Sequence, residues 1–293
     1  CIDILEGRKQ DDSMFVMIFN MDEEEDDWKD EKNWAKANPN IGKSINLKYL
    51  RAEFNQAINS PSEEVNFKTK HLNLWTDSSI AWINDEFWMS CDKGGDPSEL
   101  IGRECYAGLD LASTSDINAF VMVFPDPTEK HFDVICHFWC PERKAKEKED
   151  RVDYSLWGRQ GHIKLVEGDI VDHRIIAADI MEIVKNYQVK LIAFDRALAY
   201  GAIAQQLMDE ELPMHEFGQG WVSMSEPTKE LERKVKLQQI NHYGNPVLRW
   251  MASNIELKID PAGNIKIDKG KSSEKVDGMV ALVMALGAYD ARN

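Results

Sequence analysis

Three apolar runs decide the fold: Cys105-Tyr-Ala-Gly-Leu-Asp110, Ile117-Asn-Ala-Phe-Val-Met-Val-Phe124 and Phe132-Asp-Val-Ile-Cys-His-Phe-Trp139. Each has the length and the β-branched or aromatic content of a buried strand. The links between them are rich in Ser, Thr and Asp or turn at Asp126-Pro127, and they are short enough to join antiparallel neighbours. We therefore predict three consecutive antiparallel strands at the start of a domain.

Downstream of these runs, helical and strand patterns alternate. A helical stretch over 174–187 precedes an apolar strand over 190–195, which predicts an α/β crossover. The remaining expected elements are helices over 199–211 and 228–243, a strand over 214–217, a hairpin of 255–260 with 264–268, and a closing amphipathic helix over 277–292. The pattern predicts an α/β fold with a mixed sheet flanked by helices.

The first hundred residues have a different pattern. Residues 14–19 form a short apolar run typical of a buried strand, and residues 28–88 have mostly helical spacing. We predict a mainly helical connector here. The turn at 94–97, Gly-Gly-Asp-Pro, sets the expected domain boundary near residue 100, which gives domains 1–100 and 101–293.

Length and composition exclude several classes of protein. At roughly 150 residues per domain, 293 residues suggest about two domains. The chain has the hydrophobic and charged content of a folded protein, it has no apolar run long enough to span a bilayer, and its N-terminus lacks the layout of a signal peptide. We therefore expect no membrane partner. Five scattered cysteines favour reduced thiols in a cytoplasm, and the start at Cys1 rather than Met predicts a piece of a longer protein.

The charge is acidic overall but uneven along the chain. The formal net charge is -16, which argues against a surface that holds nucleic acid by charge alone. Residues 221–275, however, contain 10 basic and 7 acidic residues, net +3. This stretch predicts a basic patch, with ordinary solvated surface charge as the alternative for each residue. The candidates for contact with DNA are Lys229, Arg233, Lys234, Arg249, Lys269, Lys271 and Lys275.

Three aspartates lie at the ends of apolar elements. Asp110 and Asp195 each end an expected strand, and Asp277 begins the closing helix. If the first and fourth strands are neighbours and the closing helix packs on the same sheet, the three carboxylates meet at one edge. Such a cluster is an oxygen-donor site for Mg²⁺ or Mn²⁺. Ordinary roles stay open as well, because these acids can cap the Ser/Thr turn after Asp110, pair with Arg196 or cap the last helix.

A stretch similar to a phosphate loop lies at Ala37-Asn-Pro-Asn-Ile-Gly42-Lys43-Ser44, with Ala where the strict motif has Gly. A phosphate loop follows a buried strand and opens a helix. The residues before Ala37 are instead acidic and helical in pattern. We therefore expect no nucleotide binding by this stretch.

A set of ordered motifs covers nearly the whole chain: Ala35-Lys-Ala-Asn-Pro39, Leu72-Asn-Leu-Trp75, Gly108-Leu-Asp110-Leu-Ala-Ser-Thr-Ser-Asp116, Phe194-Asp195-Arg196, Gly218-Gln-Gly220-Trp221, Asn245-Pro-Val-Leu-Arg249 and Lys275-Val-Asp277-Gly278. As a set they resemble the large terminase subunit of tailed bacteriophages. The resemblance implies a ribonuclease-H-like nuclease domain over 101–293. It also implies the end of an ATPase domain and a helical linker over 1–100.

The function that this resemblance implies is a metal-dependent endonuclease, a hydrolase that cleaves concatemeric double-stranded phage DNA during genome packaging by two-metal phosphodiester hydrolysis. Two divalent ions, Mg²⁺ or Mn²⁺, are implied at the acids that match Asp110, Asp195 and Asp277, with Asp116 as a further matching acid. ATP is implied only for an N-terminal ATPase domain, whose phosphate loop is not in this sequence.

The resemblance also implies partners and a location. The partners are double-stranded DNA and, for the full-length protein, the portal protein and the small terminase subunit. A homo-oligomeric ring on the portal is implied for the full-length protein, and a monomer is expected for this chain. The implied location is the host bacterial cytoplasm, at the procapsid portal. Two alternatives stay open: an assembly module of the packaging motor with little activity alone, or another ribonuclease-H-like DNA recombinase or resolvase.

Overall fold

The computed structural model describes residues 2–5, 13–22, 26–58, 61–74, 82–111, 116–147, 152, 154–195, 202–260, 262–272 and 274–292. Its contacts divide the chain into two compact units, Cys1–Ile80 and Ala81–Asn293. The first unit contains the short helix α1 (Ile2–Leu5), the 3-10 helix η1 (Glu31–Asn33), and helices α2 (Trp34–Ala37), α3 (Leu47–Ala57) and α4 (Pro61–His71).

The helical character expected for the start of the chain is confirmed in the first unit, which has a small aromatic core. The rings of Trp34 and Phe67 are both buried, with centroids 5.3 Å apart, and Phe54 packs against both rings. The strand expected over 14–19 is wrong, because Phe15 is 85% exposed and no described strand pairs with this run. Without a neighbouring strand, its backbone has no ladder of hydrogen bonds to join.

The second unit begins about twenty residues before the boundary near residue 100 that we expected. It takes in helix α5 (Asp85–Met89) and the 3-10 helix η2 (Pro97–Leu100). Trp88 of α5 is 1% exposed and stacks on His242, with ring centroids 4.6 Å apart. An ion pair also joins Asp85 to Arg249. Residues 82–100, which we expected to belong to the connector, therefore pack with the second unit and contribute to its core.

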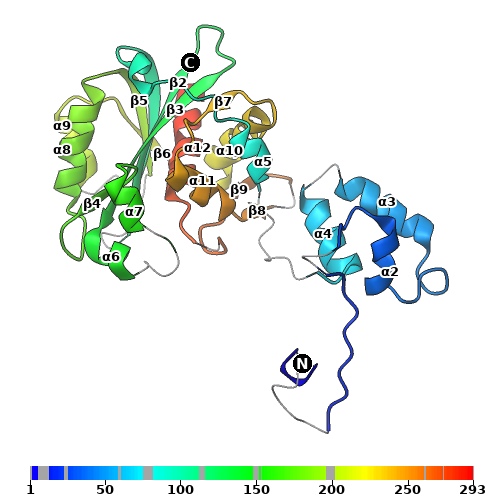
Figure 1. The fold of residues 1–293 in the computed structure, drawn as a ribbon. Coiled ribbons are helices and arrows are strands. Elements are labelled where there is room, and N and C mark those ends of the chain that lie inside the picture. The colour runs from blue at the N-terminus through cyan, green and yellow to red at the C-terminus, as the bar shows by residue number, and fades with distance from the viewer. Residues whose placement is uncertain are drawn as a thin grey trace. The chain divides into compact units, whose positions relative to one another are not determined.

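The second unit is built on a mixed sheet (Figure 1). Strands β1 (Glu104–Asp110), β2 (Asn118–Pro125) and β3 (Phe132–Pro141) pair antiparallel, as predicted. Strand β5 (Gln188–Asp195) pairs parallel to β1, and β6 (Met214–Phe217) pairs parallel to β5. The sheet order is β4-β3-β2-β1-β5-β6, and β4 (Lys164–Val166) and β7 (Ile240–Asn241) both pair with β3. The first and fourth of the expected strands, β1 and β5, are therefore neighbours, which meets the first condition for the three carboxylates to lie at one edge.

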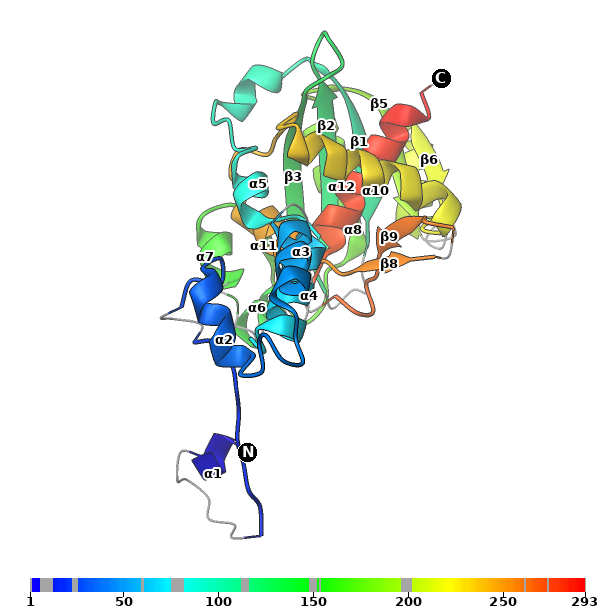
Figure 2. The ribbon, with the colours of Figure 1, turned by 90° about the vertical axis from the view of Figure 1, so that its right-hand side faces the viewer.

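Helices cover both faces of this sheet (Figures 1 and 2). Alternate residues of β1 and β2 enter two separate cores, as strand geometry requires. Phe120 and Met122 join the core under α8 (His173–Val184) and α9 (Ala202–Asp209), and Ala119 and Val121 join the core under α10 to α12. Those last helices are α10 (Trp221–Lys236), α11 (Pro246–Ser253) and α12 (Asp277–Asp290). Helices α6 (Glu142–Glu147) and α7 (Tyr154–Arg159) and the hairpin of β8 (Leu257–Ile259) and β9 (Ile265–Ile267) complete the unit.

Two expectations for the last helices need correction. The helix expected over 228–243 is α10, which begins at Trp221, continues through Pro227 and ends at Lys236. The closing helix α12 is not amphipathic, because every residue from Asp277 to Ala288 is buried. It covers the middle of the sheet and is itself covered by α10 and α11, so it has no polar face.

Glycine at position 108 lets α12 lie directly on the backbone of β1. A Cβ atom there would lie 2.0 Å from the carbonyl oxygen of Ala281. Such close contact fixes the start of α12 relative to the end of β1. Among the helices that the structure describes, none has the length and apolar content needed to cross a membrane.

Candidate functional site

Two buried aspartates meet where β1 ends and α12 begins. Asp110, the last residue of β1, is 1% exposed, and Asp277, the first residue of α12, is 6% exposed. Leu109 belongs to the core under α8 and α9, so strand alternation directs the next side chain, Asp110, toward α12. The fold therefore brings together two acids that are 167 residues apart in the sequence.

Lys269 and Gln219 complete the contacts of this pair. The Lys269 Nζ lies 2.6 Å from Asp110 Oδ2 and 3.6 Å from Asp277 Oδ1. The Gln219 side-chain amide donates a hydrogen bond of 3.0 Å to Asp110 Oδ1. The other oxygen of Asp277, Oδ2, is buried and has no hydrogen-bond partner within the part of the chain that the structure describes. A buried carboxylate oxygen in this state is costly unless a further cation or donor approaches it.

The electrostatics of the pair follow from burial and like charge. Burial and the neighbouring charge of Asp110 raise the pKa of Asp277 to about 6, although Lys269 acts in the opposite direction. For Lys269, burial opposes the charged form, but Asp110 and Asp277 together hold the pKa of its ammonium above the usual range. The two carboxylates therefore need positive charge beside them in order to remain ionised together.

Asp195, the third predicted acid, ends the strand beside β1. The parallel register pairs Leu109 with Phe194, so the residues that follow, Asp110 and Asp195, end neighbouring strands on the same side of the sheet. Within the described residues, no group of three or more His, Cys, Asp or Glu side chains is arranged to hold a metal ion. Participation of Asp195 in one metal centre therefore stays a prediction.

Asp116 lies close to the start of β2 and forms an ion pair with Lys275. Its Oδ1 also accepts a hydrogen bond of 3.0 Å from the backbone N–H of Ile117. The Ser/Thr-rich stretch 112–115 lies outside the described residues. Asp116 and Lys275 thus form a second ion pair near the two buried acids. The negative charge of Asp116 contributes to the raised pKa of Asp277.

The basic residues predicted to contact DNA have different surroundings. Lys229 and Lys271 are exposed. Arg233 forms an ion pair with Glu230. The prediction that Lys234 contacts DNA needs correction. The residue is 4% exposed, and its ammonium lies 4.1 Å from the centroid of the Phe132 ring. Buried in this way, it cannot reach a phosphate on the surface.

The residues at the end of β1 fit a divalent cation. The available donors are carboxylate oxygens, which Mg²⁺ and Mn²⁺ prefer. Asp277 Oδ2 is buried without a partner, and Lys269 shows that a positive charge fits between the two carboxylates. Sequence reasoning missed Gln219, whose only signal was its place between Gly218 and Gly220 directly before α10.

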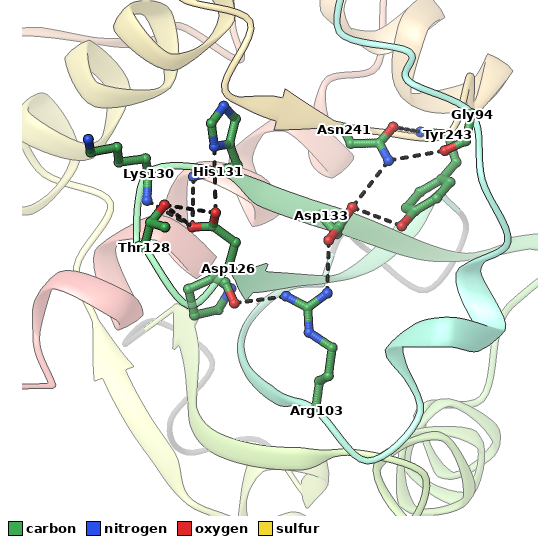
Figure 3. Close-up of polar contacts among 10 residues, drawn as sticks. Gly94, Arg103, Asp126, Thr128, Lys130, His131, Asp133, Asn241 and Tyr243 are labelled. Atoms are coloured by element: carbon green, nitrogen blue, oxygen red, sulfur yellow. Dashed lines mark hydrogen bonds and ion pairs between the residues drawn. The ribbon is translucent and has the colours of Figure 1, made fainter.

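A second polar cluster lies at the opposite end of the sheet (Figure 3). Asp133, near the start of β3, accepts hydrogen bonds from the Tyr243 hydroxyl (2.8 Å) and the Asn241 amide (3.1 Å) on Oδ1, and from Arg103 (3.1 Å) on Oδ2. Arg103 also donates to the carbonyl oxygen of Pro125 at 2.8 Å. Both oxygens of this carboxylate are therefore paired.

Comparisons with known proteins agree with this architecture. Residues 8–293 match the family model described as the endonuclease domain of the terminase large subunit. Protein YmfN of Escherichia coli (strain K12) is 32% identical over 298 residues, an alignment that covers 98% of this chain and 65% of that protein. The terminase large subunit of Enterobacteria phage HK97 is 33% identical over 264 residues, covering 88% of this chain and 51% of that protein.

A solved structure also resembles the chain. The crystal structure of the HK97 bacteriophage large terminase matches with a TM-score of 0.64 and 30% identity, covering 98% of this chain and 59% of that one. The ribonuclease-H-like fold class predicted from the sequence is confirmed. The chain spans between half and two thirds of the length of these relatives.

Proposed function

The chain belongs to the family of terminase large subunit endonuclease domains, and from that premise we propose that it is a metal-dependent endonuclease that cleaves concatemeric double-stranded phage DNA during genome packaging. The observation that carries the proposal is the buried pair Asp110 and Asp277, which keeps one carboxylate oxygen unpartnered where β1 ends. Buried like charges of this kind are typical of catalytic sites.

In this proposal Asp110, Asp195 and Asp277 would hold two divalent ions, Mg²⁺ or Mn²⁺. Asp116 is a further candidate ligand near the centre. Activation of a water nucleophile and stabilisation of the leaving 3′-oxygen are the chemistry that such ions supply to phosphodiester hydrolysis. The acidic donor set supports this assignment, because hard cations select oxygen ligands.

The side chains of the chain supply orientation and exclusion of water. The Gln219 amide donates to Asp110 Oδ1 and so fixes the direction of its carboxylate. The close contact of α12 with Gly108 holds the start of α12, and with it Asp277, at a set position beside Asp110. Burial of both acids keeps bulk water from screening their charge.

DNA contact in this proposal falls to the basic residues of 221–275 outside the core. The six that we propose are Lys229, Arg233, Arg249, Lys269, Lys271 and Lys275. Because a net charge of -16 leaves few cations for phosphate, binding to DNA by the chain alone is expected to be weak.

The partners and the location remain parts of the same proposal. We assign the start of the chain, which we expected to extend over residues 1–100 and which forms a compact unit up to Ile80, to the end of an ATPase domain and a helical linker, with ATP used only by that N-terminal domain. In the full-length protein the portal protein and the small terminase subunit are the proposed partners, in a homo-oligomeric ring at the procapsid portal in the host cytoplasm. The chain alone is proposed to be a monomer.

The decisive experiment incubates supercoiled plasmid with the purified chain in Mn²⁺, in Mg²⁺ and in EDTA, with Asp110→Asn in parallel. Cutting that requires both the metal and Asp110 supports the endonuclease. If a folded chain with metal does not cut, but forms a stable complex with a portal, the chain acts mainly in assembly of the motor. Joining of specific DNA ends instead of hydrolysis would indicate a recombinase.

A further inference from the structure

We propose that Lys269 is the internal counter-ion of the metal-free centre and that it competes with a divalent ion for Asp110 and Asp277. The competition with metal rests on the proposed function, whereas the role as counter-ion does not. Lys269 contacts both carboxylates, at 2.6 Å and 3.6 Å. Lys269 thus supplies positive charge where two buried acids would otherwise repel each other.

The hairpin of β8 and β9 sets the position of Lys269. Ile267, two residues earlier, is 6% exposed in the core under α10 to α12, and the backbone N–H of Ile265 donates to the Ser225 hydroxyl of α10 at 3.2 Å. The Asp268 N–H donates to the Glu256 carbonyl oxygen at 2.9 Å, which ties the end of β9 to the start of the hairpin. Lys269 therefore extends from a braced backbone rather than from a free loop.

The ammonium satisfies only part of the site. It reaches one oxygen of each acid, and Gln219 takes the second oxygen of Asp110, while Asp277 Oδ2 stays without a partner. A divalent ion carries twice the charge and binds carboxylate oxygens at about 2.0–2.1 Å for Mg²⁺. An ion bound to both acids would therefore occupy the space that the ammonium fills.

The side chain of Lys269 is able to leave. About two fifths of its area is exposed (39%), and the lysine side chain has four rotatable bonds, so its ammonium can swing to solvent while the hairpin stays in place. In that position it can meet a phosphate, which agrees with its place among the basic residues of 221–275. The centre thus exchanges an internal monovalent cation for a divalent one.

The consequence is a linked change in stability and metal affinity. Without metal, loss of Lys269 leaves two buried carboxylates facing each other, so the folded state is weakened. With metal, the same loss removes a competitor, so the ion binds more tightly. A lysine that serves only as a surface contact for DNA would change neither quantity.

The test compares the wild type, Lys269→Met and the matched control Lys258→Met, which removes an exposed lysine from the same hairpin. Titration with MnCl₂ by calorimetry gives the affinity, and thermal unfolding in EDTA and in Mn²⁺ gives the stability. We expect Lys269→Met to bind Mn²⁺ about 10-fold more tightly and to unfold several degrees lower in EDTA, with the difference removed by Mn²⁺. Lys258→Met should match the wild type in both measurements.

Each contrary outcome has its own meaning. Equal Mn²⁺ affinity in the wild type and Lys269→Met would overturn the competition alone. Absence of Mn²⁺ binding in both proteins would overturn the proposed function together with the competition, while unfolding in EDTA would still test the counter-ion. An unfolding temperature in EDTA that is the same for Lys269→Met and the wild type would overturn the role of Lys269 as a counter-ion. If Lys269→Met does not fold, Lys269→Gln, which keeps hydrogen-bond donors but no charge, replaces it in the same measurements.

Discussion

Asp110 and Asp133 lie at opposite ends of one sheet, and each is the centre of a polar cluster. Asp133 has three donors on its two oxygens, from Arg103, Asn241 and Tyr243. Among the described residues, Asp110 forms an ion pair with Lys269, which it shares with Asp277, and Asp277 Oδ2 is buried without a hydrogen-bond partner. Both clusters look alike in composition, since each combines acids with a base and amide or hydroxyl donors.

The difference between them favours a role in stability for the cluster around Asp133 and supports the chemical role that we propose for the pair at the end of β1. The carboxylate of Asp133 ties three segments of the fold together, and both of its oxygens already accept hydrogen bonds, one of them from the cation Arg103. The pair at the end of β1 retains capacity to bind a cation, at the cost of a raised pKa for Asp277. Unsatisfied buried charge, rather than the number of polar residues, is therefore the reason why we propose the end of β1 as the functional end of the sheet.

The largest expected effect is on catalysis. Asp110→Asn keeps the size of the side chain but removes a negative charge from the centre, so metal-dependent cutting should fall by about 10³-fold or more, with the fold retained. The matched change at the other end, Asp133→Asn, should leave the cutting rate within about twofold and lower the free energy of unfolding by about 2 kcal/mol. Plasmid cleavage rates and urea unfolding curves measure both.

Equal loss of cutting in the two variants would break the comparison, because it would make the two clusters equally important to the reaction. Far-UV circular dichroism of Asp110→Asn provides the control for folding. A folded Asp110→Asn that still cuts at the wild-type rate would remove Asp110 from the centre.

The sequence predicts this contrast only in part. The period-2 alternation of β1 to β3 and the length of the crossover predict the mixed sheet, and the acids at the ends of elements mark the candidate site. Gln219 was not found, because its contact with Asp110 depends on the turn before α10, which brings together residues 109 positions apart. The prediction that the closing helix is amphipathic was wrong for a similar reason, because burial of α12 on all sides depends on where α10 and α11 pack.

The second effect is on stability, through the contact that holds the two acids together. Gly108→Ala places a methyl group 2.0 Å from the Ala281 carbonyl oxygen, a backbone atom that cannot move without shifting α12. We expect a loss of about 3 kcal/mol in the free energy of unfolding, with a loss of cutting as well, because Asp277 moves with the helix. Gly220→Ala is the control, since no atom lies within 4 Å of the added Cβ. A Gly108→Ala protein as stable and active as the wild type would show that α12 adjusts freely.

A smaller effect is expected from the positioning of Asp110. Gln219→Leu removes the donor to Asp110 Oδ1, so the Mn²⁺ concentration for half-maximal cutting should rise about 10-fold while stability changes little. Gln205→Leu removes a similar amide donor to Asp209 on the surface of α9 and should leave the Mn²⁺ requirement unchanged. A loss of maximal rate with no change in the Mn²⁺ requirement would contradict a role for Gln219 in orienting a metal ligand.

The smallest effect belongs to the paired cluster. Tyr243→Phe removes one of three donors to Asp133 and should lower the free energy of unfolding by about 1 kcal/mol, with no change in cutting.

Burial and the hydrogen bond to Asp133 raise the pKa of Tyr243 above its ordinary value. The unfolded state therefore loses the phenolic proton first, so the wild type loses stability as the pH rises above about 10. Tyr243→Phe should reduce that loss, and unfolding curves at pH 8 and pH 10.5 measure it. An identical decline in both proteins would mean that Tyr243 ionises as easily in the fold as in the unfolded chain, and the hydrogen bond to Asp133 would then contribute nothing to holding its proton.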